Sequence, residues 1–182
     1  VATALVFGGV TTTSGWEEIT PEDAQDMIDS NLNAYLLDVR TVAEYKFVGH
    51  PNAPEDRIKN IPYWKFEFDR ASDEYFFYYV EDGNLVANIN NFFDEEVYRH
   101  FDPATDTIIV VCKTGGRAGF AAEDLEERSE PASNRLEKLG FFSIYRMTGG
   151  FKAWQDLGLP VSSGYEGIWK PSDFRGRSLK KK

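Results

Sequence analysis

Cysteine is almost absent from this chain of 182 residues, which has only one, Cys112. A single cysteine excludes an internal disulfide and any zinc or iron–sulfur site built from several cysteines. Cys112 has either a reactive role or a packing role, and the residues around it indicate which one.

The chain also lacks a long apolar run and an excess of positive charge. No stretch approaches the roughly 20 apolar residues of a membrane-spanning helix. The formal net charge is −10, so binding to nucleic acid is not expected, because its phosphates would be repelled. Residues 170–182 are the exception, with six bases and one acid. Such a basic tail is either a solvated terminus or a docking segment for an acidic protein partner or membrane.

Length and apolar content predict one α/β domain. A chain of this size with 42% hydrophobic residues closes a single sizeable core. Residues 34–40, 107–111 and 142–147 are predicted strands, and the continuous β-branched run at 107–111 is typical of a buried parallel strand. Strands that alternate with helical segments predict a central, mostly parallel sheet flanked by helices.

Local signals mark the helices and one inserted segment. Thr20 is a predicted N-cap, with Pro21 in the first turn. A helix is expected at 118–127, ended by Ser129-Glu130-Pro131 and followed by another from Asn134 to Leu139. Between 63 and 88, aromatic residues alternate with charged ones, and Asp82-Gly83 predicts a β-hairpin. These aromatics would pack an inserted flap onto the domain or line a ligand pocket.

Cys112 follows the most apolar predicted strand, at the carboxyl end where open α/β sheets bind ligands. Gly115 and Gly116 allow the backbone to curl, so that several N–H groups and the following helix dipole point at one spot. Such a cup binds an anion and favours the thiolate, the nucleophilic form of cysteine. Lys113 and Arg117 add positive charge at its rim. The alternative is a buried, inert cysteine.

The segment Cys112-Lys-Thr-Gly115-Gly-Arg117 resembles the Cys-x-x-Gly-x-Arg active-site loop of the rhodanese family. Other motifs of that family occur in the same order and together span residues 38–160: Asp38-Val-Arg40, then Glu44-Tyr45 with Gly49-His50-Pro51 and Asn60-Ile61-Pro62, and finally Gly149-Gly150-Phe-Lys-Ala-Trp154 with Gly158-Leu-Pro160. Four motifs in the correct order make a chance match improbable.

The resemblance implies a sulfurtransferase that works without a metal or organic cofactor. Cys112 would take a sulfane sulfur from thiosulfate or polysulfide as a persulfide and pass it to a thiol or cyanide acceptor. Backbone N–H groups of Lys113, Thr114, Gly115 and Gly116 would hold the terminal sulfur, and Arg117 would brace the loop. Asp38 and Arg40 would shape the loop and the charge of its mouth, as a structural ion pair or in contact with substrate.

The same resemblance divides the chain into an N-terminal extension (1–15), a rhodanese-like domain (16–162) with the aromatic insertion at 63–88, and a basic C-terminal tail (163–182). Some extracytoplasmic bacterial rhodaneses carry an aromatic-rich insertion of this sort. We therefore expect an exported, periplasmic protein, with the cytoplasm as the alternative. The missing initiator Met agrees with a processed or trimmed chain.

Two other functions compete with sulfur transfer. Phosphatases and arsenate reductases of the same fold also use a Cys in an anion cup, but their loop has five residues between Cys and Arg, whereas four separate Cys112 from Arg117. The second alternative is a noncatalytic module that presents the hairpin or the basic tail to a partner. The physiological donor and acceptor, the pathway and the oligomeric state are not specified by the sequence.

Overall fold

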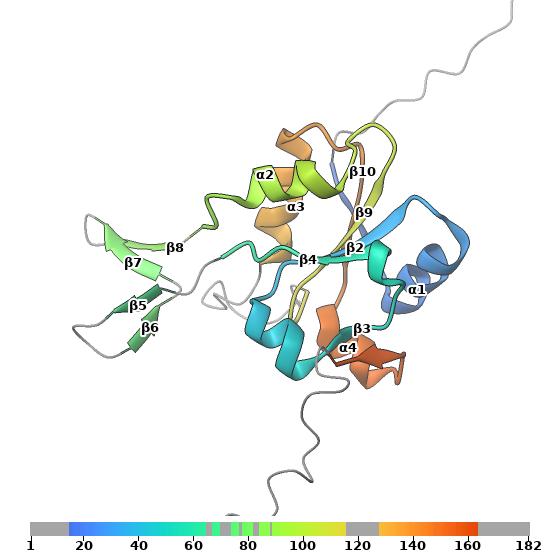
Figure 1. The fold of residues 1–182 in the computed structure, drawn as a ribbon, viewed down its shortest axis with the longest axis horizontal. Helices are drawn as coiled ribbons and strands as arrows, with labels where there is room; N and C mark the ends of the chain where they lie inside the picture. Colours follow the sequence, from blue (N-terminus) through green and yellow to red (C-terminus); the bar gives the residue numbers. More distant parts are fainter. Residues whose placement is uncertain are drawn as a thin grey trace, which may run out of the picture.

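The computed structural model describes residues 15–64, 89–115 and 128–163, together with the strands between residues 67 and 87. Its centre is a five-stranded, all-parallel sheet in the order β1-β10-β9-β2-β4, shown in Figure 1. These strands are β1 (Glu17–Ile19), β2 (Ala34–Asp38), β4 (Ile58–Asn60), β9 (Thr107–Val111) and β10 (Ser143–Met147). The α/β prediction with a parallel sheet is confirmed.

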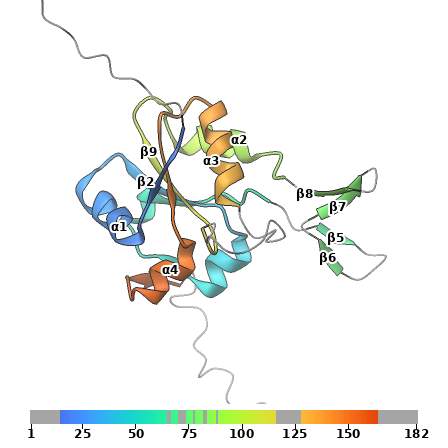
Figure 2. The same ribbon diagram turned by 180° about the vertical axis from the view of Figure 1, so that it is seen from behind.

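Helices cover both faces of the sheet, and Figures 1 and 2 show α1 with α4 on one side and α2 with α3 on the other. A second small pairing joins β3 to β11 in antiparallel fashion. The remaining bounds of these elements are α1 (Pro21–Ser30), α2 (Phe93–His100), α3 (Ser129–Lys138), α4 (Gly150–Asp156), the π-helical turn η1 (Glu44–Val48), the 3-10 turn η2 (Glu55–Arg57), β3 (His50–Pro51) and β11 (Val161–Ser162).

The central strand β9 separates two apolar clusters, which explains its uninterrupted hydrophobic run. Ile108 and Val110 point to the cluster that contains α2 and α3, while Ile109 and Val111 point to the cluster that contains α1 and α4. Side chains of a strand alternate between faces, so a strand buried on both faces is apolar at every position. Cys112 continues the alternation and belongs to the α2/α3 cluster.

The structure tests two predictions of where helices begin. Thr20 caps α1 as predicted, since its hydroxyl accepts a hydrogen bond from the Asp23 backbone N–H. By contrast, the helix predicted from Asn134 to Leu139 begins earlier than expected, because α3 starts at Ser129. Pro131 lies in its first turn, where no backbone donor is required. The helix expected at 118–127 lies outside the described residues.

The interval predicted to hold one hairpin contains two antiparallel strand pairs. β5 (Glu67–Asp69) pairs with β6 (Glu74–Phe76), and β7 (Tyr78–Glu81) pairs with β8 (Asn84–Ala87). Figure 1 shows these strands beyond α2, to one side of the domain. Of the helices that the structure describes, none has the length and hydropathy to cross a bilayer.

Candidate active site

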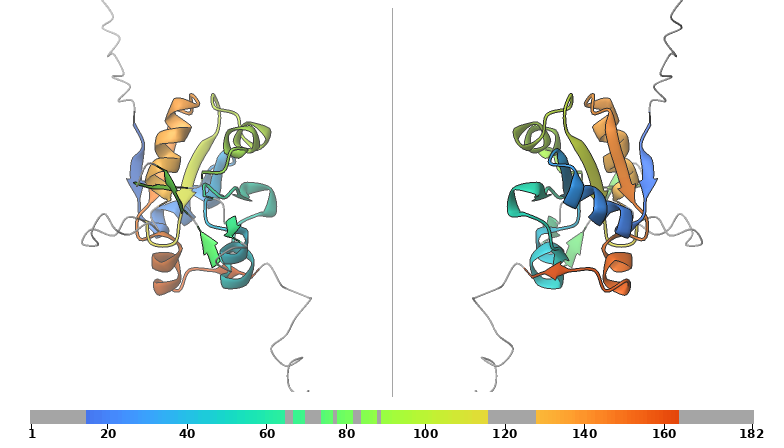
Figure 3. Two further views of the ribbon diagram at one scale, coloured as in Figure 1. Left: turned by 90° about the vertical axis from the view of Figure 1, so that its left-hand side faces the viewer. Right: turned by 90° about the vertical axis from the view of Figure 1, so that its right-hand side faces the viewer.

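Cys112 is the first residue after β9, at the carboxyl end of the sheet, and is fully buried. The helix α4 holds the backbone on either side of it: Phe151 N–H donates to the Cys112 carbonyl (2.8 Å), and Lys152 N–H donates to the Lys113 carbonyl (3.0 Å). Figure 3 shows α4 and the η1 turn at this same end of the domain. The Cys112 and Lys113 carbonyls therefore face α4, and the Gly115 N–H turns toward the thiol.

Two groups contact the sulfur of Cys112. The Gly115 backbone N–H donates to Sγ at 3.0 Å, and the thiol donates to the Ser129 hydroxyl at 3.2 Å. Ser129 is the first residue of α3. The sulfur thus lies between a curled backbone segment and the start of a helix, the surroundings that stabilise negative charge on sulfur.

Glycine is required where the Cys112 loop meets the start of α4. Gly115 and Gly150 both have left-handed φ angles, +58° and +56°. A Cβ on Gly115 would lie less than 3.0 Å from the Met147 carbonyl oxygen and from the Gly150 nitrogen, and a Cβ on Gly150 would come equally close to the Cys112 carbonyl oxygen. Backbone contact at this distance tolerates no side chain, so these two glycines set the position of the loop.

A buried ion pair supports the far side of the site. Arg128 donates to both oxygens of Glu44, through Nη1 at 2.6 Å and Nη2 at 2.8 Å, and its side chain is 3% exposed. Glu44 also accepts bonds from the backbone N–H and hydroxyl of Thr41, while Thr41 Oγ1 accepts from the Glu44 N–H. This reciprocal pairing is a capping box, which orients the carboxylate toward Arg128.

The charge of Arg128 acts on the cysteine as well as on Glu44. Burial lowers the pKa of Arg128, but the Glu44 carboxylate, with smaller contributions from Cys112 and Asp38, raises it above its ordinary value overall. Burial would likewise raise the pKa of Glu44, yet Arg128 and Thr41 lower it to about 2. Both groups are charged at neutral pH, and a permanent guanidinium lies within electrostatic reach of Cys112.

One nitrogen atom of Arg128 makes no hydrogen bond to a described residue. Its Nε is buried and has no hydrogen-bond partner within the described part of the chain. A buried, unpaired donor on a cation is costly unless a ligand or water meets it. Next to Cys112, this group is suited to an anionic substrate.

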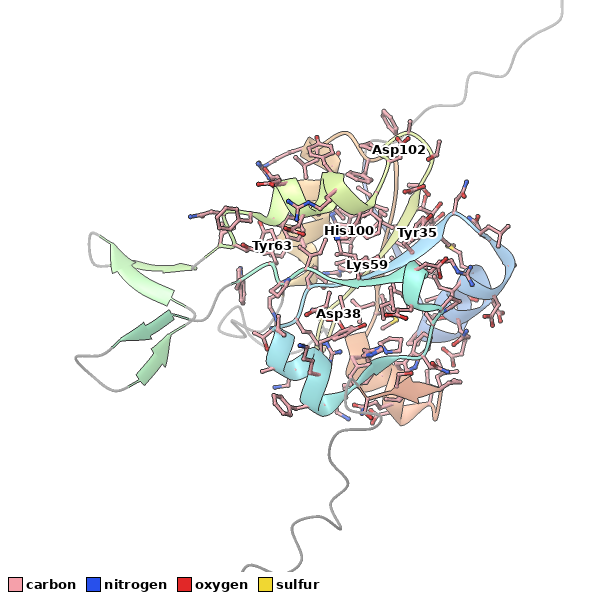
Figure 4. The ribbon with its side chains drawn as sticks, viewed as in Figure 1. Tyr35, Asp38, Lys59, Tyr63, His100 and Asp102 are labelled. Atoms are coloured by element: carbon pink, nitrogen blue, oxygen red, sulfur yellow. The ribbon has the colours of Figure 1, made fainter. Side chains whose placement is uncertain are left out.

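Asp38 and Arg40, at the end of β2, form a second buried ion pair. Arg40 Nε and Nη2 bond to the Asp38 carboxylate at 2.5 to 3.1 Å, and Nη2 also donates to the Gly49 carbonyl at 2.7 Å. The guanidinium lies 4.2 Å from the Phe151 ring centroid, so the pair also links β2 to α4. Figure 4 labels Asp38 above the η1 turn. These contacts give both residues a structural role, and a role in substrate binding stays a prediction.

The structure brings some of the predicted site residues together and leaves others undescribed. Cys112 and Gly115 are in contact, Lys113 is exposed, and Thr114 is half-buried. Gly116 and Arg117 lie outside the described residues, so the role assigned to Arg117 stays a prediction.

The bracing contact that the structure does describe is made by Arg128, which sequence analysis missed together with Ser129. The sequence does contain a signal for a helix that starts at Ser129. The buried positions of α3 have helical spacing, at Ser129, Ala132, Ser133 and Leu136.

Cys112 thus lies at the carboxyl end of a parallel strand, with the Gly115 N–H directed at its sulfur and the buried Arg128 within electrostatic reach. The family model described as the rhodanese-like domain matches residues 20–157. The chain therefore belongs to the rhodanese-like family.

Several known proteins resemble this chain. Rhodanese-like domain-containing protein 17 of Arabidopsis thaliana is 32% identical over 79% of this chain and 70% of its own length. The thiosulfate sulfurtransferase GlpE of Actinobacillus succinogenes is 28% identical over 81% of this chain and 92% of its own. Among solved structures, the polysulfide-sulfur transferase homodimer of Wolinella succinogenes superposes with a TM-score of 0.53 at 21% identity, covering 87% of this chain and 86% of that one. That likeness supports the fold.

Proposed function

We propose that this protein is a sulfurtransferase that carries sulfane sulfur on Cys112 as a persulfide. The observation that carries the proposal is the Gly115 N–H directed at Cys112 Sγ, at 3.0 Å, in a loop held from behind by α4. Backbone donors around a cysteine accommodate a thiolate or a terminal persulfide sulfur, both of which are anionic. Sulfurtransferases among the relatives support the same activity.

Each half-reaction exchanges one bond at sulfur. The Cys112 thiolate attacks the outer sulfur of thiosulfate, the bond to the sulfonate sulfur breaks, and sulfite leaves with the electron pair. A cyanide or thiolate acceptor then attacks the terminal sulfur of the persulfide, and Cys112 leaves as the thiolate. With polysulfide, a shorter polysulfide leaves in place of sulfite. Neither half-reaction needs a metal or an organic cofactor.

The charges around the sulfur favour an anionic donor. Arg128 contributes a buried guanidinium near Cys112, and its Nε is an unused donor within the described residues. Lys113 adds an exposed cation next in sequence to the nucleophile. Thiosulfate and polysulfide are both small anions, so both match this environment.

The test is intact-mass measurement after incubation with each donor. Wild-type protein should gain the mass of one sulfur atom, lose it again on addition of cyanide, and release thiocyanate. Cys112→Ser should gain nothing, and it should fold normally because oxygen replaces sulfur without added bulk. Absence of an adduct from every sulfane donor would refute the proposal. Cys112-dependent hydrolysis of a phenyl phosphate ester would favour a phosphatase instead.

We also propose a periplasmic location and a docking role for the basic tail, on the charge pattern and family resemblance given above. Deletion of residues 170–182 should leave cyanide-dependent turnover unchanged and weaken capture of an acidic partner. Unchanged capture would remove the docking role without affecting the proposed chemistry.

A further inference from the structure

A cavity of about 550 Å³ lies between the first turn of α2 and one face of α3. Its volume is within the range of about 300–1,000 Å³ found for small-molecule sites. On α3 it is lined by Pro131, Asn134, Arg135 and Lys138, whose spacing places them on one side of the helix. No described residue of the Cys112 loop lines it, so it is a separate site.

Tyr63 contributes a hydroxyl group to the lining of this cavity. The residue is 7% exposed, and its ring packs edge-on against Phe93 with centroids 5.0 Å apart. The hydroxyl makes no hydrogen bond to any described residue, so it is available to a ligand in the cavity. Figure 4 labels Tyr63 below α2, on the side from which the strands of the insertion extend. A tyrosine hydroxyl can donate a hydrogen bond to a ligand that carries an acceptor.

The charges of the lining favour one negative charge on that ligand. Arg135 donates through Nε and Nη2 to the two oxygens of Asp94, so these two residues neutralise one another. Lys138 makes no ion pair with any described residue, and it leaves the cavity with one net positive charge. The burial of Tyr63 raises its pKa, so its hydroxyl stays protonated and available as a donor.

The rest of the lining combines the side-chain amides of Asn90, Asn91 and Asn134 with apolar groups. Of the apolar groups, Ile89 is 47% exposed and Pro131 is half-buried, whereas the Phe93 ring is buried. An apolar ligand body would cover these surfaces and remove them from water. A bare inorganic anion would leave them uncovered.

We propose that this cavity binds an organic carboxylate, with the carboxylate group at Tyr63 and Lys138 and the apolar body against Ile89 and Pro131. A monoanion matches the single net charge. The proposal is independent of the chemistry assigned to Cys112, because no described residue is shared between the two sites.

Titration of the full chain with phenylpropionate, followed by nitrogen–proton correlation NMR, tests the proposal. The side-chain amides of Asn90, Asn91 and Asn134, which line the cavity, report on occupancy. We expect saturable shifts of these signals with phenylpropionate and weaker binding of the neutral phenylpropanamide. Tyr63→Phe should weaken binding of the acid about fivefold, because it removes a hydrogen bond to an anion. Lys138→Gln should weaken binding about twofold to fivefold, because it removes an exposed charge.

Two matched variants control for general effects. Tyr98→Phe removes a hydroxyl that bonds the Leu139 carbonyl at 2.8 Å, and Lys152→Gln removes an exposed lysine paired with Asp156. Neither residue lines the cavity, so both variants should bind like wild type. Absence of saturable shifts, equal affinity for acid and amide, or wild-type binding by both Tyr63→Phe and Lys138→Gln would overturn the proposal. The spectra also show directly whether each variant is folded.

Discussion

Replacement of Glu44 by Gln is expected to destabilise the protein in a pH-dependent way. Burial alone would raise the pKa of Glu44, but Arg128 and Thr41 lower it from 4.5 to about 2. At about 1.4 kcal/mol for each tenfold change in proton affinity, this corresponds to a stabilisation on the order of 3 kcal/mol at neutral pH. Loss of one partner from a buried pair has a cost of similar size, about 3–5 kcal/mol.

The sign follows from the direction of the pKa change. The folded-state pKa lies below the unfolded value, so the stabilisation is complete above about pH 5 and is lost as the pH falls toward 2. Urea unfolding of wild type and Glu44→Gln at about pH 7 should differ by about 3 kcal/mol, and at about pH 3.5 this difference should shrink by more than ~1 kcal/mol. Gln resembles the protonated carboxyl group, because neither carries a charge.

Asp94→Asn is the matched control. Asp94 also receives two bonds from an arginine, Arg135, but both side chains are well exposed, at 37% and 43%. An exposed pair contributes less than ~1 kcal/mol, so this variant should be nearly as stable as wild type at both pH values. The reasoning would be refuted if Glu44→Gln cost no more than Asp94→Asn, or if its cost did not change with pH.

Two further substitutions test the support of Cys112. Ser129→Ala removes the hydroxyl 3.2 Å from Sγ and should slow thiocyanate formation about fivefold, at a stability cost of no more than ~1.5 kcal/mol in urea unfolding. Ser133→Ala is the control, because it removes a buried hydroxyl that has no partner among the described residues. It should change neither the rate of thiocyanate formation nor the stability, and effects as large as those of Ser129→Ala would contradict a specific role for Ser129. Gly150→Ala would place a Cβ under 3.0 Å from the Cys112 carbonyl oxygen and should lower the free energy of unfolding by more than ~2 kcal/mol. Gly140 also has a left-handed φ but open space around it, so Gly140→Ala should lower the free energy of unfolding by only ~1–2 kcal/mol. If the two glycine variants unfold at similar temperatures, the close contact at Gly150 does not destabilise the protein beyond the effect of the left-handed φ.

Local patterns in the sequence determined the central strand of the sheet and the position of Cys112. The β-branched run at 107–111 predicts β9 with the bounds that the structure shows, because a strand covered on both faces has to be apolar throughout. The cap of α1 at Thr20 follows equally from adjacent residues. Cys112 could be placed at the strand end for the same reason, since neighbours in sequence remain neighbours in space.

Only the tertiary structure decided which side chains surround the sulfur. Ser129 and Arg128 lie far from Cys112 in the sequence, and they reach it because α3 packs against β9 and β10. The three residues of β1 are likewise a strand only because β10 supplies their partners. The sequence predicts the start of α3 at Asn134, whereas the folded chain begins it at Ser129, with Pro131 in its first turn. Contacts between distant segments depend on how the chain packs, and packing leaves no local pattern at any one of the residues involved.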